Sequence, residues 1–236
     1  MHTNSMKEES ARPVPPSMKS LPTPPYRKSL PPLPASRSRP SAPVTVTRDA
    51  LGVALPPGIP ERGWTKLTTF EADLHGLRGT ALFLDLDVVI VDDITPFFEA
   101  PGEFLIIHDY KRPWRVTGNS SVYRFELGAH PDVLEHFRGH FAEIRAQFRN
   151  EQAYLSDFLH RQGKLAYWPA DWCPSFKYHG IPAWPTNYWR EPFVPPGARI
   201  VIFHGECNPP DALAGRRNRR FRYIRPATWV AEHWHE

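Results

Sequence analysis

Long hydrophobic runs and cysteine are both scarce in this 236-residue sequence. A membrane-spanning helix needs about 20 mostly apolar residues, and no such run occurs. A secretory signal needs a basic segment followed by a short apolar one, and that pair is also missing. Cys173 and Cys207 make no disulfide framework, which favours a reducing compartment. We therefore expect a cytoplasmic protein with no membrane span, with peripheral membrane association left open.

Proline, by contrast, is abundant. Many of the 28 prolines lie before residue 45, in segments such as P-V-P-P, P-T-P-P-Y and L-P-P-L-P. Too little apolar surface is present there to offset the entropy of ordering the chain. The composition predicts a disordered, Pro-rich tail over residues 1–43 and a folded domain over residues 44–236. A P-x-x-P segment also suits docking on an aromatic groove, so an adaptor role stays open.

The formal net charge of +4 is unevenly distributed. Seven basic residues fall in the tail, where only Glu8 and Glu9 oppose them, and the rest of the chain is close to neutral. An arginine cluster near the carboxyl end matches no recognisable nucleic-acid-binding fold. We therefore expect no specific nucleic-acid partner. The arginines of that cluster are Arg216, Arg217, Arg219 and Arg220.

The most informative stretch is A-L-F-L-D-L-D-V-V-I-V-D-D, residues 81–93. Its Val, Ile and Leu content predicts a strand buried on both faces of a parallel sheet. Asp85 and Asp87 interrupt it, and side chains two apart on a strand share a face. At about 4 Å and an effective dielectric near 20, two carboxylates repel by roughly 4 kcal/mol. A hard divalent cation, Mg²⁺ or Mn²⁺, bound between the two carboxylates would remove this repulsion. The alternative to a metal site is that one aspartate caps a turn and the other is solvated at the end of the strand.

Helical and strand patterns alternate along the rest of the domain. Helices are predicted at residues 64–74, 130–148 and 151–159, and a further short helix is predicted to begin at Thr95. Asn150 is expected to be the N-cap of the helix over residues 151–159. Strands are predicted at residues 81–93, 104–108, 120–125, 165–168 and 199–204. This alternation predicts an α/β fold with a mainly parallel sheet flanked by helices. Ligands of such sheets bind beyond the carboxyl ends of the strands, where Asp85, Asp87 and His204 are expected.

The order of five motifs, W-x-K-L, L-F-L-D-L-D-V-V-I-V, N-S-S-V, E-Q and F-H-G, resembles GT-A-fold (Rossmann-like) glycosyltransferases related to the glycogenin-like, retaining family. The resemblance covers roughly residues 44–210. It implies that Asp85, Asp87 and His204 hold Mn²⁺ or Mg²⁺, and that the metal holds the pyrophosphate of a nucleoside-diphosphate sugar. Oxygen and nitrogen ligands suit these ions.

The resemblance also assigns residues around the donor sugar. It implies that Lys66 reaches the donor and that Asn119, Glu151 and Gln152 are the catalytic residues, with Asn119 in a family N-x-G turn and Glu151 and Gln152 beside the sugar. Ser121 stands where that turn usually has glycine. Each residue also has a structural alternative. Lys66 could be a surface lysine on an amphipathic helix, Asn119 could stabilise a turn, and Gln152 could pack its aliphatic stem on the sheet.

The loop after His204 departs from the family pattern. It is shortened to H-G-E-C-N-P-P, so that Gly205 and Asn208 fall at substrate-binding positions and Asn208 stands where a phosphate-binding lysine is expected. An amide cannot make the charge-assisted hydrogen bond of a lysine. The arginine cluster offers substitute charge. In the family, a first strand, a glycine turn and a helix hold the nucleoside, and this unit has no counterpart before residue 44. We therefore expect that the amino end of the domain is truncated or replaced, that nucleotide binding is weak and that one side of the sheet is uncovered.

These features predict a metal-dependent glycosyltransferase that uses a nucleoside-diphosphate sugar and an unknown acceptor, a glycan, lipid or protein. A haloacid-dehalogenase-like phosphohydrolase is the first alternative, because D-x-D-x-V after an apolar strand also suits an aspartyl nucleophile with Mg²⁺. A non-catalytic, degenerate transferase domain is the second. The lysine missing at position 208 and the missing first unit favour it.

Overall fold

The computed structural model describes residues 63–205, 207–215 and 223–234. The tail expected over residues 1–43, the domain boundary at residue 44 and the arginine cluster lie outside these residues and stay predictions. Within the described ranges, the helices are all too short or too polar to cross a lipid bilayer.

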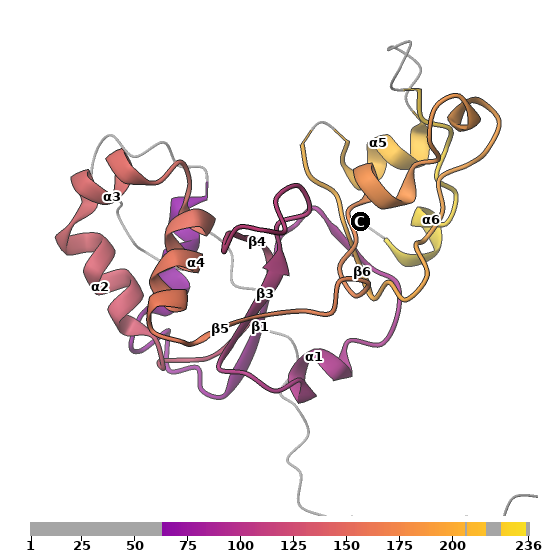
Figure 1. Cartoon of the computed structure of the whole chain (residues 1–236). Helices are drawn as coiled ribbons and strands as arrows, with labels where there is room; N and C mark the ends of the chain where they lie inside the picture. Colours follow the sequence, from indigo (N-terminus) through magenta and orange to yellow (C-terminus); the bar gives the residue numbers. More distant parts are fainter. Residues whose placement is uncertain (1–62, 206, 216–222, 235–236) are drawn as a thin grey trace, which may run out of the picture. The chain divides into compact units, whose positions relative to one another are not determined.

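A four-stranded sheet forms the centre of the fold, in the order β1-β4-β3-β5 (Figure 1). Its strands are β1 (Thr80–Leu84), β3 (Phe104–His108), β4 (Gly118–Glu126) and β5 (Leu165–Tyr167). β4 runs antiparallel to both of its neighbours, β1 and β3, whereas β3 and β5 are parallel. Two further strands, β2 (Val88–Ile90) and β6 (Ile200–Ile202), form a separate antiparallel pair.

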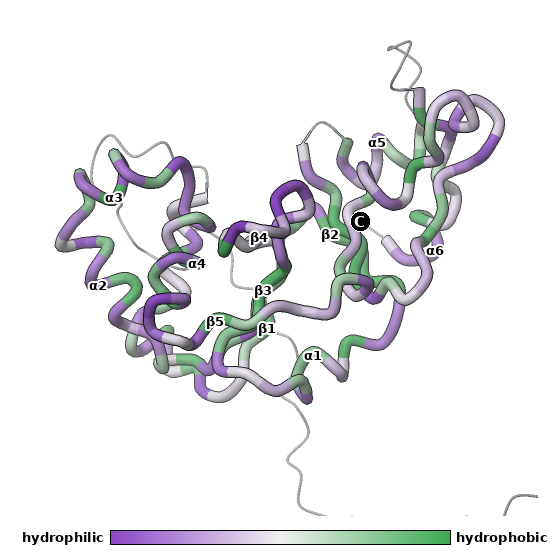
Figure 2. The backbone as a smooth tube through the Cα atoms, in the orientation of Figure 1, coloured by the Kyte–Doolittle hydropathy of each residue, from purple (hydrophilic) through white to green (hydrophobic). Residues whose placement is uncertain are grey.

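Side chains alternate between the two faces of each strand, so the sheet separates the interior into distinct cores. On β3, Phe104 and Ile106 face a core made with the helices on one side of the sheet, and Leu105 and Ile107 face a second core that includes Phe97. This two-sided burial explains why β3 reads as a continuous apolar run, visible as a hydrophobic stretch in Figure 2. A third core packs the β2–β6 pair against the last two helices.

Helices flank the four-stranded sheet and the β2–β6 pair. A 3-10 helix, η2, packs with α2, α3 and α4 on one face of the four-stranded sheet, and α5 and α6 lie beside β6 (Figure 1). Their bounds, with the short α1, are η2 (Trp64–Phe70), α1 (Thr95–Glu99), α2 (Pro131–Gly139), α3 (Phe141–Gln147), α4 (Glu151–Arg161), α5 (Pro209–Ala214) and α6 (Val230–His233). The predicted cap of α4 is confirmed, because the Asn150 side chain accepts the backbone N–H of Ala153 at 3.2 Å.

The α/β class and the sheet flanked by helices are confirmed, with two corrections. First, the sheet is mixed rather than mainly parallel: only the β3–β5 pair of the named strands is parallel. Apolar runs report burial, and burial on both faces does not fix strand direction. Second, the strand predicted over residues 81–93 is wrong as one element. It divides into β1 and β2, which belong to different sheets.

Two predicted helices also differ in detail. The helix over residues 64–74 is a 3-10 helix that ends at Phe70. The apolar stripe over residues 130–148 spans α2 and α3, which are separated at His140. Their apolar residues still face one core, because a short break between two helices preserves the stripe.

Candidate active site

The candidate site lies at one edge of the four-stranded sheet. β1 and β3 both end there and β4 begins there, because β4 is antiparallel to each of them. Asp85 follows β1, and its backbone N–H donates to the Ser121 carbonyl at 2.9 Å, which extends the β1–β4 ladder by one residue. Asn119 and Ser120 are the second and third residues of β4. Side chains from these two strands therefore meet at this edge.

The D-L-D motif bridges the two sheets. Between Asp85 and β2 the chain turns outward at Leu86, whose side chain is 96% exposed. The Asp87 carbonyl then accepts the backbone N–H of Phe203 at 2.9 Å, next to the β2–β6 pair. The two carboxylates thus sit at a junction between sheets and not on one face of a single strand. Leu86 leaves the sheet because neither sheet pairs with it.

Lys66 holds the first carboxylate of the motif. Its Nζ donates to Asp85 Oδ2 at 2.7 Å, and it lies 3.3 Å from both the Oγ and the carbonyl oxygen of Ser120. The side chains of Lys66 and Asp85 are only 20% and 22% exposed, so solvent screens the pair weakly. η2 supplies this lysine, while its Trp64, Leu67 and Phe70 are buried in the core.

Glu151, the first residue of α4, also belongs to this cluster. The residue is 6% exposed, and its Oε1 accepts the Ser120 hydroxyl at 2.8 Å and lies 4.0 Å from Lys66 Nζ. The neighbouring Gln152 accepts the Ser120 backbone N–H through Oε1 at 3.3 Å. Gly63 makes room for Glu151, since a Cβ at position 63 would stand 2.4 Å from Glu151 Oε2.

Ser120 is the residue that joins these groups, and the sequence analysis missed it. Its hydroxyl lies between Lys66 and Glu151, and its backbone N–H meets Gln152. The signal was the N-S-S-V segment, where small polar residues open an otherwise buried strand. Asn119, which the resemblance singled out, accepts the Ser121 N–H at 2.8 Å, next to a register shift between β3 and β4. Its contact in this structure is therefore a local one within β4.

Negative charge exceeds positive charge in the cluster. Within the described ranges, Asp85, Asp87 and Glu151 are opposed by one ammonium group, that of Lys66. Burial raises the pKa of Asp87 above its ordinary value, and the neighbouring Asp85 raises it further, while Lys66 opposes both effects. The position of Asp87 therefore favours any cation that enters the site.

His204 lies after β6, and its contacts are separate from the Lys66 cluster. Its Nε2 is 2.7 Å from the Oγ of the buried Ser175, and Tyr110 stacks on its ring with centroids 6.0 Å apart. Burial lowers the pKa of His204, and Lys177 and Lys111 lower it further. Throughout the described chain, no three His, Cys, Asp or Glu side chains are grouped at metal-ligand spacing. Asp85, Asp87 and His204 therefore stay a predicted ligand set.

The loop after His204 gives two residues structural roles. Gly205 has φ +89°, a left-handed conformation that glycine adopts without strain. Asn208 begins α5 as its N-cap in a capping box with Asp211, and its backbone N–H donates to Asp211 Oδ2 at 3.3 Å. The substrate contacts predicted for Gly205 and Asn208 stay predictions.

Comparisons with known proteins place few constraints on this chain. No family model matches the sequence, and no curated protein matches it. Among solved structures, the galactosyltransferase LgtC with donor and acceptor sugar analogues is 14% identical over 65% of this chain, with a TM-score of 0.42. The glycosyltransferase GlyE of Streptococcus pneumoniae TIGR4 is 12% identical over 68%, with a TM-score of 0.44, and its apo form is 12% identical over 71%, with a TM-score of 0.45. The chain spans 60%, 40% and 42% of these structures.

Proposed function

We propose that this chain is a glycosyltransferase that moves a sugar from a nucleoside-diphosphate sugar to a glycan, lipid or protein acceptor. The observation that supports the proposal is the convergence at Ser120. Lys66, Asp85, Glu151 and Gln152 come from three separate segments; the resemblance implied that Asp85 holds the metal and that the other three lie at the donor sugar. All four meet within hydrogen-bond or ion-pair distance at one sheet edge.

A divalent cation fits the chemistry of this edge. Mn²⁺ or Mg²⁺ would be held by Asp85 and Asp87, because carboxylate oxygens suit these ions. To act as the nitrogen ligand, His204 would have to give up its Nε2 contact with Ser175 or use its other ring nitrogen. The raised pKa of Asp87 supports this, since burial next to a second carboxylate is relieved by a positive charge. When bound, the ion would offset the negative charge that develops on the departing diphosphate.

The remaining residues orient the donor sugar. Lys66 donates to Asp85 at 2.7 Å and, at 3.3 Å, to the hydroxyl and carbonyl oxygens of Ser120, so a sugar or phosphate oxygen would take the place of one of the two longer contacts. Gln152 uses its carbonyl oxygen on Ser120, which leaves its amide N–H groups as donors for hydroxyl or leaving-group oxygens. Glu151 fixes the Ser120 hydroxyl and thereby the position of Lys66. Together they form a preorganised polar wall beside the junction of the two sheets.

Turnover of donor sugars tests this proposal. The protein with Mn²⁺ is incubated with UDP-, GDP- and ADP-sugars, and release of nucleoside diphosphate is measured for wild type and Asp85→Asn. Asp92→Asn is the matched control, because Asp92 is an exposed aspartate beyond β2. Release that is lost in Asp85→Asn and kept in Asp92→Asn supports the proposal. No release from any donor by wild type contradicts it and favours the non-catalytic alternative. Proton NMR of the product then distinguishes retention from inversion.

The Lys66–Asp85 contact also favours a second function, phosphoester hydrolysis. A lysine 2.7 Å from the first aspartate of D-x-D would orient an aspartyl nucleophile and stabilise its phosphorylated form. Hydrolysis of a generic aryl phosphate with Mg²⁺, abolished by Asp85→Asn, would support this function over sugar transfer.

A further inference from the structure

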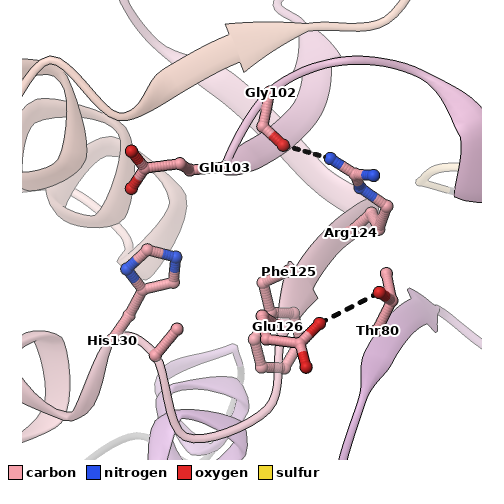
Figure 3. A pocket seen from close by; sticks show the side chains of 8 residues that line it. Thr80, Gly102, Glu103, Arg124, Phe125, Glu126 and His130 are labelled. Carbon is pink, nitrogen blue, oxygen red and sulfur yellow. Dashed lines mark hydrogen bonds between the residues drawn. The ribbon is translucent and has the colours of Figure 1, made fainter.

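A hollow lies at the edge of the four-stranded sheet opposite Asp85. β1 and β3 begin there and β4 ends there, so the hollow is separated from the Asp85 edge by the full length of β1. Its volume is about 200 Å³, and Thr80, Glu103, Arg124, Glu126 and His130 contribute to its lining (Figure 3). None of these residues was assigned a role from the sequence.

His130 is a buried polar residue in the lining of this hollow. It precedes α2, is 2% exposed, and packs edge-on against Phe104 with ring centroids 6.1 Å apart. Apart from a weak contact with the Glu103 backbone, neither ring nitrogen has a hydrogen-bond partner among the described residues. Burial lowers its pKa and Lys164 lowers it further, against the opposing effects of Asp132 and Glu103. The ring therefore offers one N–H donor and one acceptor to whatever enters the hollow.

Arg124 adds a second buried donor. The residue is 8% exposed, and its terminal nitrogens donate to the carbonyl oxygens of Phe98, at 3.4 Å, and Gly102. Its Nε has no partner among the described residues. Unpaired buried polar groups are uncommon in native proteins because leaving them unsatisfied costs free energy, so two in one hollow indicate an external partner.

Two carboxylates stand at the rim. Glu126 accepts the Thr80 hydroxyl at 2.9 Å, and no hydrogen bond is found for the Glu103 side chain within the described part of the chain. In Figure 3 the Glu103 carboxylate and the His130 ring lie on one side of the hollow, and the Thr80–Glu126 pair lies on the other. The lining thus combines two buried donors with two exposed acceptors.

We infer that this hollow binds a sugar through its hydroxyl groups. Each hydroxyl both donates and accepts, so one ring can accept from Arg124 and His130 and donate to Glu103 and Glu126. An anion is disfavoured because it would face both carboxylates while the terminal donors of Arg124 are occupied. A cation is disfavoured because it would face the buried guanidinium. The inference does not rest on the proposed transfer reaction, since the two sites lie at opposite sheet edges.

Saturation-transfer NMR on the full chain tests the inference, with D-galactose, D-glucose and N-acetyl-D-glucosamine as probes and the His130 ring resonances as the site reporter. We expect millimolar binding of at least one sugar and a dose-dependent shift of the His130 signals. Glu103→Gln and Glu126→Gln should each weaken binding about tenfold, and His130→Phe should abolish it. Glu135→Gln, an exposed glutamate on α2 outside the hollow, should leave binding unchanged.

Several outcomes overturn the inference. If glycine or inorganic phosphate shifts the His130 signals and no sugar does, the hollow binds charged ligands. If none of the probes shifts them, it holds only water. If His130→Phe does not fold, the inference is tested with Glu103→Gln and Glu126→Gln, and unchanged sugar binding in both variants overturns it. Asp87→Ala must still bind the sugar at His130, which separates a failure here from a failure of the proposed transferase.

Discussion

The Lys66 ammonium donates to the Asp85 carboxylate at 2.7 Å across 19 residues of sequence, and both side chains are about four-fifths buried. The same Nζ lies 3.3 Å from Ser120 Oγ, which in turn donates to Glu151. This chain of contacts ties η2, β1, β4 and α4 together at one sheet edge. It makes Lys66 both a structural link and a candidate donor ligand.

Coupling between Lys66 and Asp85 can be measured with a double-mutant cycle of Lys66→Met and Asp85→Asn. Because the pair is mostly buried, we expect a coupling of about 1–3 kcal/mol in the free energy of unfolding, from urea titration. The exposed Arg78–Asp73 pair, also at 2.7 Å, is the control, and its coupling should be close to zero. Equal couplings in the two cycles would contradict the assigned role of Lys66.

Gly63→Ala should destabilise the protein by about 1–3 kcal/mol, because the new Cβ meets Glu151 Oε2 and the residue has φ +92°. Gly76→Ala is the control: it shares the positive φ, +73°, but has open space around the Cβ. Thermal unfolding should therefore show the larger loss for Gly63→Ala. Adding Glu151→Ala should recover the part that comes from the clash. No recovery would mean that only the backbone is strained.

The pH dependence of stability should report His130. Its pKa is lowered in the folded state, so the unfolded state binds its proton more tightly. Stability from this group is therefore full above the unfolded pKa near 6.5 and is lost as the pH falls through the folded pKa. His130→Phe cannot titrate, so the difference in unfolding free energy between wild type and variant should shift in favour of the variant below about pH 6. The control is the same substitution at His160, an exposed residue of α4. A difference independent of pH would contradict a buried neutral His130.

Much of this architecture was predictable from local pattern. The apolar run of β3, the Asn150 cap of α4 and the order of elements follow from burial and capping, which act over a few residues. The strand directions were not predictable, because they depend on pairing between distant segments. Leu86 shows why the single strand failed: an apolar residue within an apolar run is 96% exposed where the chain passes between two sheets.

The candidate site was predictable in part for the same reason. Lys66, Asp85, Glu151 and Gln152 were assigned from motifs, and the structure brings them together. Ser120 was missed because its importance comes from the partners on η2 and α4, which the sequence does not place next to it. His130 was likewise hidden, because its unpaired nitrogens are apparent only once its surroundings are known.

Calorimetric titration of UDP with Mn²⁺ into wild type and Asp87→Ala tests the proposed function most directly. We expect metal-dependent binding by wild type that is lost in Asp87→Ala, because burial and the neighbouring Asp85 both raise the pKa of Asp87 and a bound cation would favour its ionised form. Asp92→Asn should bind like wild type. Binding that is unchanged in Asp87→Ala, or that needs no metal, would contradict a metal-dependent donor site at this sheet edge.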